Sequence, residues 1–593
     1  MRTGIITNQP EEVSYTTGDR QTENKPRTNT IYAEVKKERE WKAYRIREQQ
    51  HATAAQIRRS RPDDVDKGVM KELKQVAVTM RCFEPADPSK LNSEIWETKV
   101  MRMFMMLAEK YSAQGDFDKV KGRFNANPKT IRRPLKQTDN ASPTATIEAI
   151  NTLIHLYVTR RAKGAIIRGY DITGAFTHVD FEKGGYYGLI DPTTAKAILK
   201  LRPDLATGMM KNGTLLVRIV KAIYGLEESA KLFYEHLTEH IKANGYKRTD
   251  EDPCALYKGE DSQDREAALA IHVDDMIGVF RNNQEADNFE RMIEKRYGKV
   301  ARQDLTSQTN MNFTGRTITL NKNQDIEVGM DRMTEKAIEG HTGLGTRKYA
   351  IEPDIYKIRT TDGYDQDINQ ETFLSKLMTL MYLGRNLRYD IMVGLSFLCT
   401  RVSKPTRCDG EKLWNIIDYV KATKDRKLVF RKDANDTLIN YVDASHNCHA
   451  DGRGHSAIVI KVGYNTIGIR CNKQKDMTES SCEAEIVALH YATMENIWIS
   501  SMVEQMGICH SGPVIMYEDN KSAKILADRG FSNANRFLAR RYIRIHEEIK
   551  QGNIEVRHMQ TIKQVADVLT KSIQGKKYEG FIEYLMQGTT KKK

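Results

Sequence analysis

The sequence predicts a multidomain protein of the α/β and α+β classes, and three observations support that prediction. The chain has 593 residues, and at roughly 150 residues per domain this length suits about four domains. Residues 438–472 contain three apolar strand patterns, after which helix and strand patterns alternate, as in a mixed sheet covered by helices. The longest apolar stretch, Ile391–Cys399, is far shorter than the roughly 18 residues of a membrane span, so we expect no membrane partner.

The charge balance favours a polyanionic partner. Lys and Arg total 93 against 79 Asp and Glu, which gives a net charge of +14. A basic excess of this kind favours nucleic-acid binding, although it also serves solubility alone. The eight cysteines contain no Cys-x-x-Cys pair, which favours a reduced cytoplasmic or nuclear setting over a disulfide scaffold.

One group of possible metal ligands follows the first strand pattern of residues 438–472. It contains His446, Cys448, His449 and His455. The group lacks the two paired ligand spacings of structural zinc sites, so we interpret it as a polar loop and keep zinc as the minor alternative.

The elements before residue 438 follow from local patterns. Residues 1–65 are polar and rich in charge, which is typical of a basic arm that is disordered or partly helical. Apolar runs at 103–111 and 117–126 predict a β-hairpin around Ser-Ala-Gln-Gly-Asp. We then expect a helix over 146–161, a strand over 165–172, a helix over 230–245, a hairpin of strands 267–273 and 276–280, and a mainly helical stretch over 370–423.

The last third of the chain has its own order of elements. Strands are predicted at 438–444, 457–463, 466–472, 514–520 and 554–559, and helices at 479–507, 520–530, 539–552 and 564–573. The chain ends in Thr-Thr-Lys-Lys-Lys, which we interpret as a frayed basic tail.

Acidic residues lie at the ends of predicted strands. Asp171 ends the strand over 165–172, and Asp274 and Asp275 lie between the two strands of the second hairpin. Adjacent acids at such a place are most often an ordinary turn. The alternative is a metal site, because crowded carboxylates repel each other unless a cation neutralises them. Oxygen ligands suit Mg²⁺, and two such ions can stabilise the attacking and leaving oxygens of phosphoryl transfer.

These segments resemble a known family. Tyr170-Asp171-Ile-Thr-Gly-Ala-Phe176 and His272-Val-Asp274-Asp275-Met276 resemble catalytic motifs of copia-type LTR-retrotransposon reverse transcriptases, part of a Pol polyprotein. Ala222-Ile-Tyr224-Gly225-Leu226 resembles the family's template- and nucleotide-binding segment, and Phe313-Thr-Gly315 its primer grip. The motifs occur in family order within about residues 71–431, and the resemblance implies a right-hand polymerase fold with fingers, palm and thumb/connection.

The resemblance implies that Asp171, Asp274 and Asp275 bind two Mg²⁺ ions, with Mn²⁺ as a substitute. It implies that Phe176 excludes ribonucleotides by a clash at the sugar 2′ position; the alternative is an ordinary core aromatic.

The resemblance also implies substrate contacts. Lys121 and Arg123 would hold the triphosphate of the incoming nucleotide, since cations on a hairpin suit polyphosphate, or they are solvated charges. Tyr224 and Gly225 would let nucleotide and template approach closely; the glycine could also be only a turn.

Four acids in the last third are similar, in order and context, to the Asp-Glu-Asp-Asp set of RNase H domains. They are Asp443, Glu485, Asp519 and Asp567. We choose Glu485 over Glu483 because Glu-Ile-Val-Ala-Leu fits the family's helix register, and residues two apart do not share a helix face. This centre too would use two Mg²⁺ ions.

The resemblance therefore implies a division of the chain into five parts. They are a basic arm (1–65), reverse transcriptase fingers and palm (66–300), thumb/connection (301–432), an RNase H-like mixed α/β domain (433–578) and a basic tail (579–593).

The expected function is an RNA- and DNA-directed DNA polymerase with RNase H activity. The implied partners are an RNA template, a DNA primer, an RNA–DNA hybrid and deoxynucleoside triphosphates, with a homodimer left open and a location in a cytoplasmic virus-like particle, in the nucleus or in both. Departures from the family leave an alternative. Glu227 and Glu228 would oppose a phosphate backbone, and His272 stands where the family usually has Tyr. The alternative is a decayed or co-opted copy that binds nucleic acid without DNA synthesis.

Overall fold

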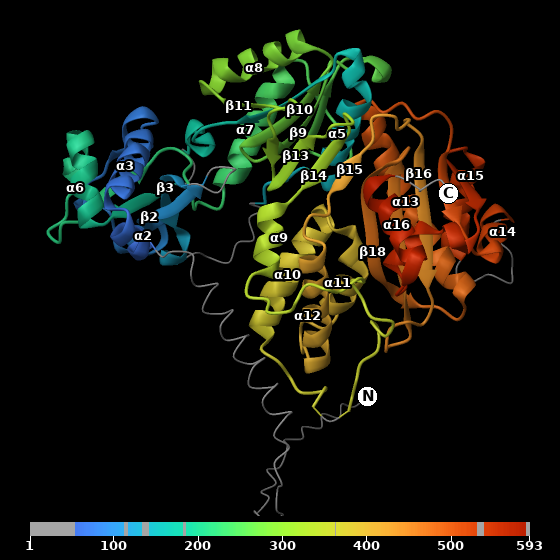
Figure 1. The fold of residues 1–593 in the computed structure, drawn as a ribbon. Helices are drawn as coiled ribbons and strands as arrows, with labels where there is room; N and C mark the ends of the chain where they lie inside the picture. Colours follow the sequence, from blue (N-terminus) through green and yellow to red (C-terminus); the bar gives the residue numbers. More distant parts are fainter. Residues whose placement is uncertain are drawn as a thin grey trace, which may run out of the picture.

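The computed structural model describes residues 54–111, 117–132, 141–181, 185–361, 363–529 and 539–588, arranged as Figure 1 shows. Within these residues the strands form four sheets. The first sheet lies at one side of the molecule and the fourth at the opposite side, with the second sheet and a set of helices between them (Figure 1). Over the same ranges, no helix combines the length and apolar character needed to cross a membrane.

The first sheet has the strand order β1-β6-β5-β2-β3 and contains the first hairpin predicted from the sequence. The antiparallel pairing of β2 with β3 confirms that hairpin, whose tip at 112–116 lies outside the described residues. Buried and exposed residues alternate along much of β3, so Lys121 and Arg123 share its exposed face. The elements are α2 (Ala54–Ser60), α3 (Pro62–Leu73), β1 (Phe83–Pro85), α4 (Ser93–Lys99), β2 (Val100–Tyr111), β3 (Phe117–Asn127), β5 (Tyr187–Ile190), α6 (Pro192–Leu201) and β6 (Leu215–Ile219).

The part of the basic arm that the structure describes is helical and packed. Ile57 of α2 and Val65 of α3 are buried against Val120 of β3. The end of the predicted arm, residues 54–65, is therefore helical and packed against the first sheet. Residues 1–53 of the predicted arm lie outside the described residues.

The second sheet has the order β11-β4-β10-β9-β8-β7, and its central strands position the first set of acids. Antiparallel pairing of β9 with β10 confirms the second hairpin predicted from the sequence. Its elements are α5 (Ile147–Arg160), β4 (Ile166–Asp171), α7 (Ser229–Ala243), β7 (Lys247–Arg248), β8 (Ala255–Lys258), β9 (Ala267–His272), β10 (Asp275–Phe280), α8 (Asn283–Tyr297) and β11 (Ala301–Asp304).

In the third sheet, a helical segment of the chain lies between the last two strands. The order of this sheet is β12-β13-β14-β15, and β15 joins β14 only after the chain has passed through four helices. The helices confirm the mainly helical stretch predicted over 370–423. The elements are β12 (Met311–Phe313), β13 (Arg316–Leu320), β14 (Ile326–Gly329), α9 (Asp331–Ile338), α10 (Gln370–Asn386), α11 (Met392–Cys399), α12 (Arg407–Ala422) and β15 (Leu428–Phe430).

The C-terminal sheet has the order β18-β17-β16-β19-β20. The first three strands form an antiparallel meander, and β19 and β20 run parallel to β16. This mixed sheet with helices confirms the predicted fold class, a multidomain α/β and α+β protein that ends in an RNase H-like domain. The elements are β16 (Leu438–Ser445), β17 (Arg453–Val462), β18 (Asn465–Met477), α13 (Ser481–Met506), β19 (Val514–Glu518), α14 (Lys521–Arg529), α15 (Ala539–Lys550), β20 (Ile554–His558) and α16 (Gly575–Gln587).

Two predictions near the C-terminus are wrong. Residues 564–573 form no α-helix; they contain a short 3₁₀ turn, η11 (Val565–Leu569), in which all five residues are buried. Because all five residues are buried, Asp567 included, the turn has no solvent face that could extend into an amphipathic helix. Residues 579–587, predicted as a frayed tail, belong to α16, whose Tyr578, Phe581, Ile582, Leu585 and Met586 are buried.

Helix α5 connects the second sheet with the C-terminal domain. Thr146 accepts a hydrogen bond from the backbone N–H of Ala149 and so caps the helix, and every residue from Glu148 to Val158 is buried. The side-chain amide of Asn151 donates to the carbonyl of Ile467 in β18 (2.9 Å). Arg470 of β18 forms an ion pair with Glu148. The two parts of the chain therefore share a buried, hydrogen-bonded interface.

Candidate active sites

The three acids predicted for DNA synthesis meet at the carboxyl end of β4. Asp171 ends β4 and lies directly opposite Asp275, the first residue of β10. Asp274 lies in the two-residue turn between β9 and β10, because His272 pairs with Asp275. The carbonyl of Asp274 accepts a hydrogen bond from the N–H of Ile172 (3.1 Å), which ties the turn to the segment after β4.

The turn that carries Asp274 holds a strained residue. Val273 has φ of +61°, a value that two-residue hairpin turns require and that β-branched residues rarely adopt. Such a conformation costs about 1–3 kcal/mol, which the surrounding strand pairs must outweigh. Backbone strain of this kind concentrates at functional sites.

Burial and like charge act on these carboxyls. Burial, followed by the charges of Asp171 and Asp274, raises the pKa of Asp275 to about 7. Burial and Asp274 raise the pKa of Asp171. The N–H of Thr314, in the turn between β12 and β13, donates to the Asp275 carboxylate and partly opposes the shift of its pKa. Crowded carboxylate oxygens of this kind suit a divalent cation such as Mg²⁺ or Mn²⁺.

The predicted nucleotide-binding residues face these acids. The positive charges of Lys121 and Arg123 act to lower the pKa of Asp171. The Arg123 guanidinium lies 5.1 Å from the ring centroid of Tyr224, and the Tyr224 ring lies 5.0 Å from that of Phe176. The two basic residues, the two aromatic residues and the acids thus line one region between the first and second sheets.

Gly225 allows the loop that carries Tyr224 to lie against β3. Its φ is +93°, and a Cβ atom there would lie 2.0 Å from the carbonyl oxygen of Ala126. The N–H of Ala126 donates to the carbonyl of Tyr224 (2.8 Å), so the contact is a backbone hydrogen bond. A glycine is required here both by conformation and by space.

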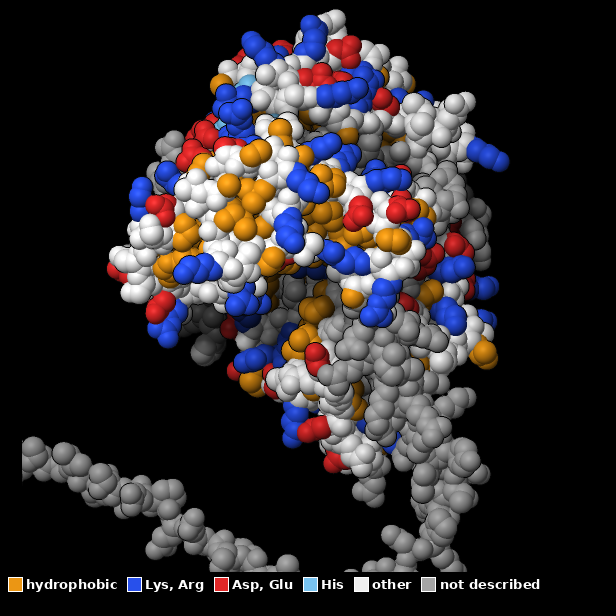
Figure 2. Space-filling view, turned by 90° about the vertical axis from the view of Figure 1, so that its left-hand side faces the viewer, with side chains coloured by type: hydrophobic (Ala, Val, Ile, Leu, Met, Phe, Trp, Pro, Cys, Tyr) orange, Lys and Arg blue, Asp and Glu red, His pale blue; other side chains and the backbone are white. Residues whose placement is uncertain are grey.

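Basic residues extend away from this region along the first hairpin. The pKa of Lys110 is lowered by burial and then by the charges of Lys121, Arg123 and Arg332 of α9, so the hairpin and α9 approach each other. Figure 2, seen from the side of the first sheet, shows Lys and Arg side chains spread among hydrophobic ones. Mixed basic and apolar surfaces suit the phosphates and bases of a nucleic-acid strand.

The four RNase H-type acids also meet. Tyr441 of β16 and Tyr517 of β19 pair with each other on parallel strands. Asp443 and Asp519 lie two residues further along their respective chain segments, and so at the same end of the sheet. One carboxylate oxygen from each of Asp443, Asp519 and Asp567 lies within 4.8 Å of the other two. A second group with the same spacing contains Glu485 of α13, Glu518 and Asp519.

These two groups fit divalent metal ions more closely than the acids of β4 and β10 do. Across the described ranges, every set of three or more candidate ligand atoms within 4.8 Å of one another belongs to the C-terminal domain. Asp171, Asp274 and Asp275 would therefore have to move closer together to share one ion.

Sequence reasoning missed several residues of the C-terminal centre. The Lys571 ammonium lies 3.0 Å from Asp443 Oδ1 and 2.7 Å from Asp567 Oδ1. Lys577 of α16 lies 2.7 Å from Asp567 Oδ2, and the Thr570 hydroxyl donates to Asp443. The four-residue spacing from Asp567 could have suggested Lys571, but Lys577 reaches the site only because α16 folds back onto it.

The buried acids of this centre have raised pKa values. Burial raises the pKa of Asp443 to about 7, although Lys571 opposes the shift. Burial and then neighbouring carboxylates, Glu518 first, raise the pKa of Glu485 well above its usual value. For Glu518, burial is again the largest cause of a raised pKa.

The histidine and cysteine group has its ligand atoms in pairs. His449 Nε2 lies 3.2 Å from His455 Nδ1, and His455 Nε2 lies 3.3 Å from Cys471 Sγ. Where the structure describes the chain, these residues do not gather three ligand atoms within 4.8 Å. His449 lies in the predicted loop but is buried, whereas His455 belongs to β17. Burial lowers the pKa values of these histidines, to about 4 and about 3 respectively.

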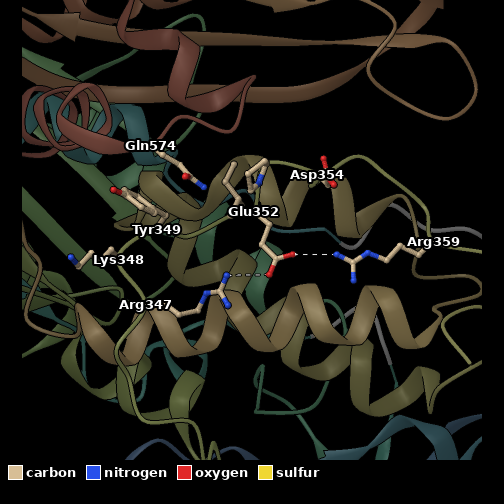
Figure 3. A pocket seen from close by; sticks show the side chains of 9 residues that line it. Arg347, Lys348, Tyr349, Glu352, Asp354, Arg359 and Gln574 are labelled. Carbon is tan, nitrogen blue, oxygen red and sulfur yellow. Dashed lines mark hydrogen bonds and ion pairs between the residues drawn. The ribbon is translucent and has the colours of Figure 1, made fainter. Parts of the chain in front are cut away.

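A cavity of about 430 Å³ lies elsewhere and contains none of the acids of either centre. Figure 3 shows Glu352 in it between Arg347 and Arg359, with N–O distances of 3.2 and 3.9 Å. The central carboxylate of this cavity is thus already paired with two arginines.

Comparison with known proteins supports the resemblance seen in the motifs. No protein-family model matches the chain. It is 22% identical over 485 residues to "Retrovirus-related Pol polyprotein from transposon RE2" of Arabidopsis thaliana, across 80% of this chain and 31% of that protein. It is 22% identical over 442 residues to "Transposon Ty1-GR2 Gag-Pol polyprotein" of Saccharomyces cerevisiae, across 71% of this chain and 24% of that protein.

The chain thus spans a third or less of the length of these relatives. Among solved structures, a foamy viral protease-reverse transcriptase in complex with double-stranded DNA matches with a TM-score of 0.39 and 12% identity, across 77% of this chain and 67% of that one. On the strength of its sequence matches, the chain is a homologue of the Pol polyproteins of copia-type and Ty1 retrotransposons.

Proposed function

We propose that the chain is a reverse transcriptase that also cleaves the RNA strand of RNA–DNA hybrids. The observation that supports DNA synthesis best is the pairing of Asp171 with Asp275 on adjacent strands, beside Asp274 and opposite Lys121 and Arg123. Negative groups for cations and positive groups for a triphosphate then face one region, as nucleotidyl transfer requires.

In this proposal each residue has one role. Asp171, Asp274 and Asp275 would hold two Mg²⁺ ions, with Mn²⁺ as a substitute, which when bound stabilise negative charge on the reacting phosphate. Lys121 and Arg123 bind the triphosphate oxygens of the incoming deoxynucleotide.

The aromatic residues orient that nucleotide. Phe176 packs at the sugar and disfavours a 2′-hydroxyl, while Tyr224 supports Phe176 and Arg123 through its ring contacts. Gly225 keeps the loop of Tyr224 against β3.

The proposed nuclease centre uses the C-terminal acids. Asp443, Glu485, Asp519 and Asp567 would hold divalent ions that activate water and stabilise the leaving 3′ oxygen. The partners are then an RNA template, a DNA primer, deoxynucleoside triphosphates and the RNA–DNA hybrid, whose backbone and 2′-hydroxyls such a domain contacts. We place the protein in a cytoplasmic virus-like particle, in the nucleus or in both.

A second candidate function is nucleic-acid binding without synthesis. Glu227 and Glu228 precede α7, close to Tyr224 and Gly225, and would repel a template backbone there. Lys571 and Lys577 already neutralise Asp443 and Asp567. Both observations would suit a copy that has lost catalysis.

Primer extension on an RNA template separates the two functions. We expect extension by the wild type with Mg²⁺ and all four deoxynucleotides, and none by Asp274→Asn/Asp275→Asn. In a parallel reaction with a labelled hybrid, that variant should still cleave RNA, whereas Asp443→Asn/Asp519→Asn should not.

The matched control is Asp63→Asn/Asp64→Asn, which removes adjacent acids from the first turn of α3 and should extend as the wild type does. Folded wild-type protein that binds hybrid but neither extends nor cleaves would establish the second candidate function instead.

A further inference from the structure

The carboxylates of the C-terminal centre form two groups that differ in how their charge is balanced. Asp443, Asp519 and Asp567 form one group, and Glu485, Glu518 and Asp519 form the other, so Asp519 is shared. Glu518 follows Tyr517 in β19 and is no member of the Asp-Glu-Asp-Asp set that the sequence predicts.

The first group already contains a cation. The Lys571 ammonium binds Asp443 and Asp567 at 3.0 and 2.7 Å, and Lys577 binds the second oxygen of Asp567 at 2.7 Å. An ammonium at these distances occupies the space between two carboxylates where a metal ion would otherwise lie.

The second group has no cation in direct contact with its glutamates. The charge of Lys571 reaches Glu485 and Glu518 and acts to lower their pKa values, but its ammonium is paired with Asp443 and Asp567. Among the described residues, no Lys, Arg or His forms an ion pair with Glu485 or Glu518. Glu518 is 0% exposed and Glu485 is 5% exposed, and within the same ranges the Oε2 atom of each has no hydrogen-bond partner. Buried carboxylate oxygens without a partner are strongly unfavourable unless a cation or a proton balances them.

The backbone holds Glu518 in this position. Its Oε1 accepts a hydrogen bond from the N–H of Asn520 (2.9 Å), which leaves Oε2 as the atom without a partner. β19 pairs with β16 on one side and β20 on the other, so the strand end cannot easily turn the side chain away.

We propose that Glu518 is a metal ligand, and that Glu485, Glu518 and Asp519 bind one divalent cation, Mg²⁺ or Mn²⁺, beside the group that Lys571 neutralises. Three oxygen donors suit a hard cation that keeps further positions for water and phosphate. The site refines the nuclease centre proposed above, and cation binding can be measured without RNA cleavage.

The test is calorimetric titration with MnCl₂ alone, in the Asp274→Asn/Asp275→Asn background that removes the first set of acids. We expect one Mn²⁺ ion per chain, and roughly 10- to 100-fold weaker binding for Glu518→Gln, since even outer-sphere partners of a metal contribute that much. The matched control is Glu504→Gln, which changes an exposed glutamate on the same helix as Glu485 and should bind Mn²⁺ as before.

Two outcomes would overturn the proposal. Unchanged Mn²⁺ affinity in Glu518→Gln, together with higher thermal stability in EDTA, would show that the two glutamates share a proton instead. Loss of the Mn²⁺ ion in Asp567→Asn, which changes only the first group, would place the cation there. The proposal instead expects Asp567→Asn to keep the ion and Lys571→Met to bind a second one.

Circular dichroism of each variant separates loss of binding from loss of fold. Mn²⁺ bound as expected without RNA cleavage would contradict the nuclease function and leave the role of Glu518 intact.

Discussion

Asp171 and Asp275 lie directly opposite each other on the antiparallel strands β4 and β10. Because backbone pairing sets their separation, the two carboxyls are held together before any cation binds. The repulsion between these carboxylates should affect the stability of the metal-free protein, which can be measured.

The pKa of Asp275, raised to about 7, predicts a pH-dependent stability. Below the ordinary Asp pKa near 4, folded and unfolded chains are both protonated at this position. Between about pH 4 and pH 7 the unfolded chain ionises first, so the carboxyl progressively destabilises the fold. In EDTA at pH 8, Asp275→Asn should therefore be more stable than the wild type by about 1–3 kcal/mol, after a discount for solvent screening.

Urea denaturation at pH 8 and pH 4.5 checks this expectation. The gain should shrink towards zero at pH 4.5, and Asp433→Asn, at an exposed position, should show no gain at either pH. A gain of equal size at both pH values would mean that repulsion between carboxylates is not its cause.

Gly225→Ala should disrupt the nucleotide-binding region. The added Cβ meets the Ala126 carbonyl at 2.0 Å, so the hydrogen bond between Ala126 and Tyr224 must break or β3 must shift. We expect a loss of stability of about 2–4 kcal/mol from strain and overpacking, and loss of primer extension with RNA cleavage kept.

Gly552→Ala is the matched control for Gly225→Ala. Gly552 has φ of +75° and open space around it, so only the conformational cost of about 1–2 kcal/mol applies. Equal losses of stability in the two variants would contradict the role of close backbone approach.

Val273→Gly should relieve strain in the turn between β9 and β10. Removing the strained backbone conformation should stabilise the fold by about 1–3 kcal/mol. The greater conformational freedom of glycine in the unfolded chain should cost about 0.5–1 kcal/mol, so we expect a modest net gain in stability. Because the turn orients Asp274 and Asp275, we expect the same variant to extend primers more slowly. Val273→Ala is the comparison, since alanine keeps a Cβ at positive φ. If the alanine variant unfolds with a larger free energy than the glycine variant, strain at this position is not the cause of the gain.

Arg470→Met should weaken the interface between α5 and the C-terminal sheet. Arg470 pairs with Glu148, which is buried, and with Glu495. Leaving a buried charge unpaired costs about 3–5 kcal/mol, which urea denaturation would measure.

The control for Arg470→Met is Arg218→Met, which breaks an exposed pair with Glu84 and should cost at most about 1 kcal/mol. A similar small cost at Arg470 would mean that the ion pair does not stabilise the interface.

The sequence was sufficient for the strands and helices that have a clear apolar period, and for the seven acids as candidates. The hairpins of β2 with β3 and of β9 with β10 were predicted from alternation and turn residues. The buried 3₁₀ turn at Val565–Leu569 was predicted as a helix, because a short, mostly apolar segment carries no clear period. Helix α16 was missed although its buried residues Tyr578, Phe581, Ile582 and Leu585 follow helical spacing.

The sequence by itself determined the order of the elements and which carboxylates stand at strand ends, because both depend on neighbouring residues in the chain. Only the tertiary structure decided which charges meet. Lys577 reaches Asp567 from α16, Glu518 faces Glu485 from a different element, and Lys121 faces Asp171 from another sheet. Such contacts join residues distant in sequence, and burial then sets the strength of their charges, so no local pattern encodes them.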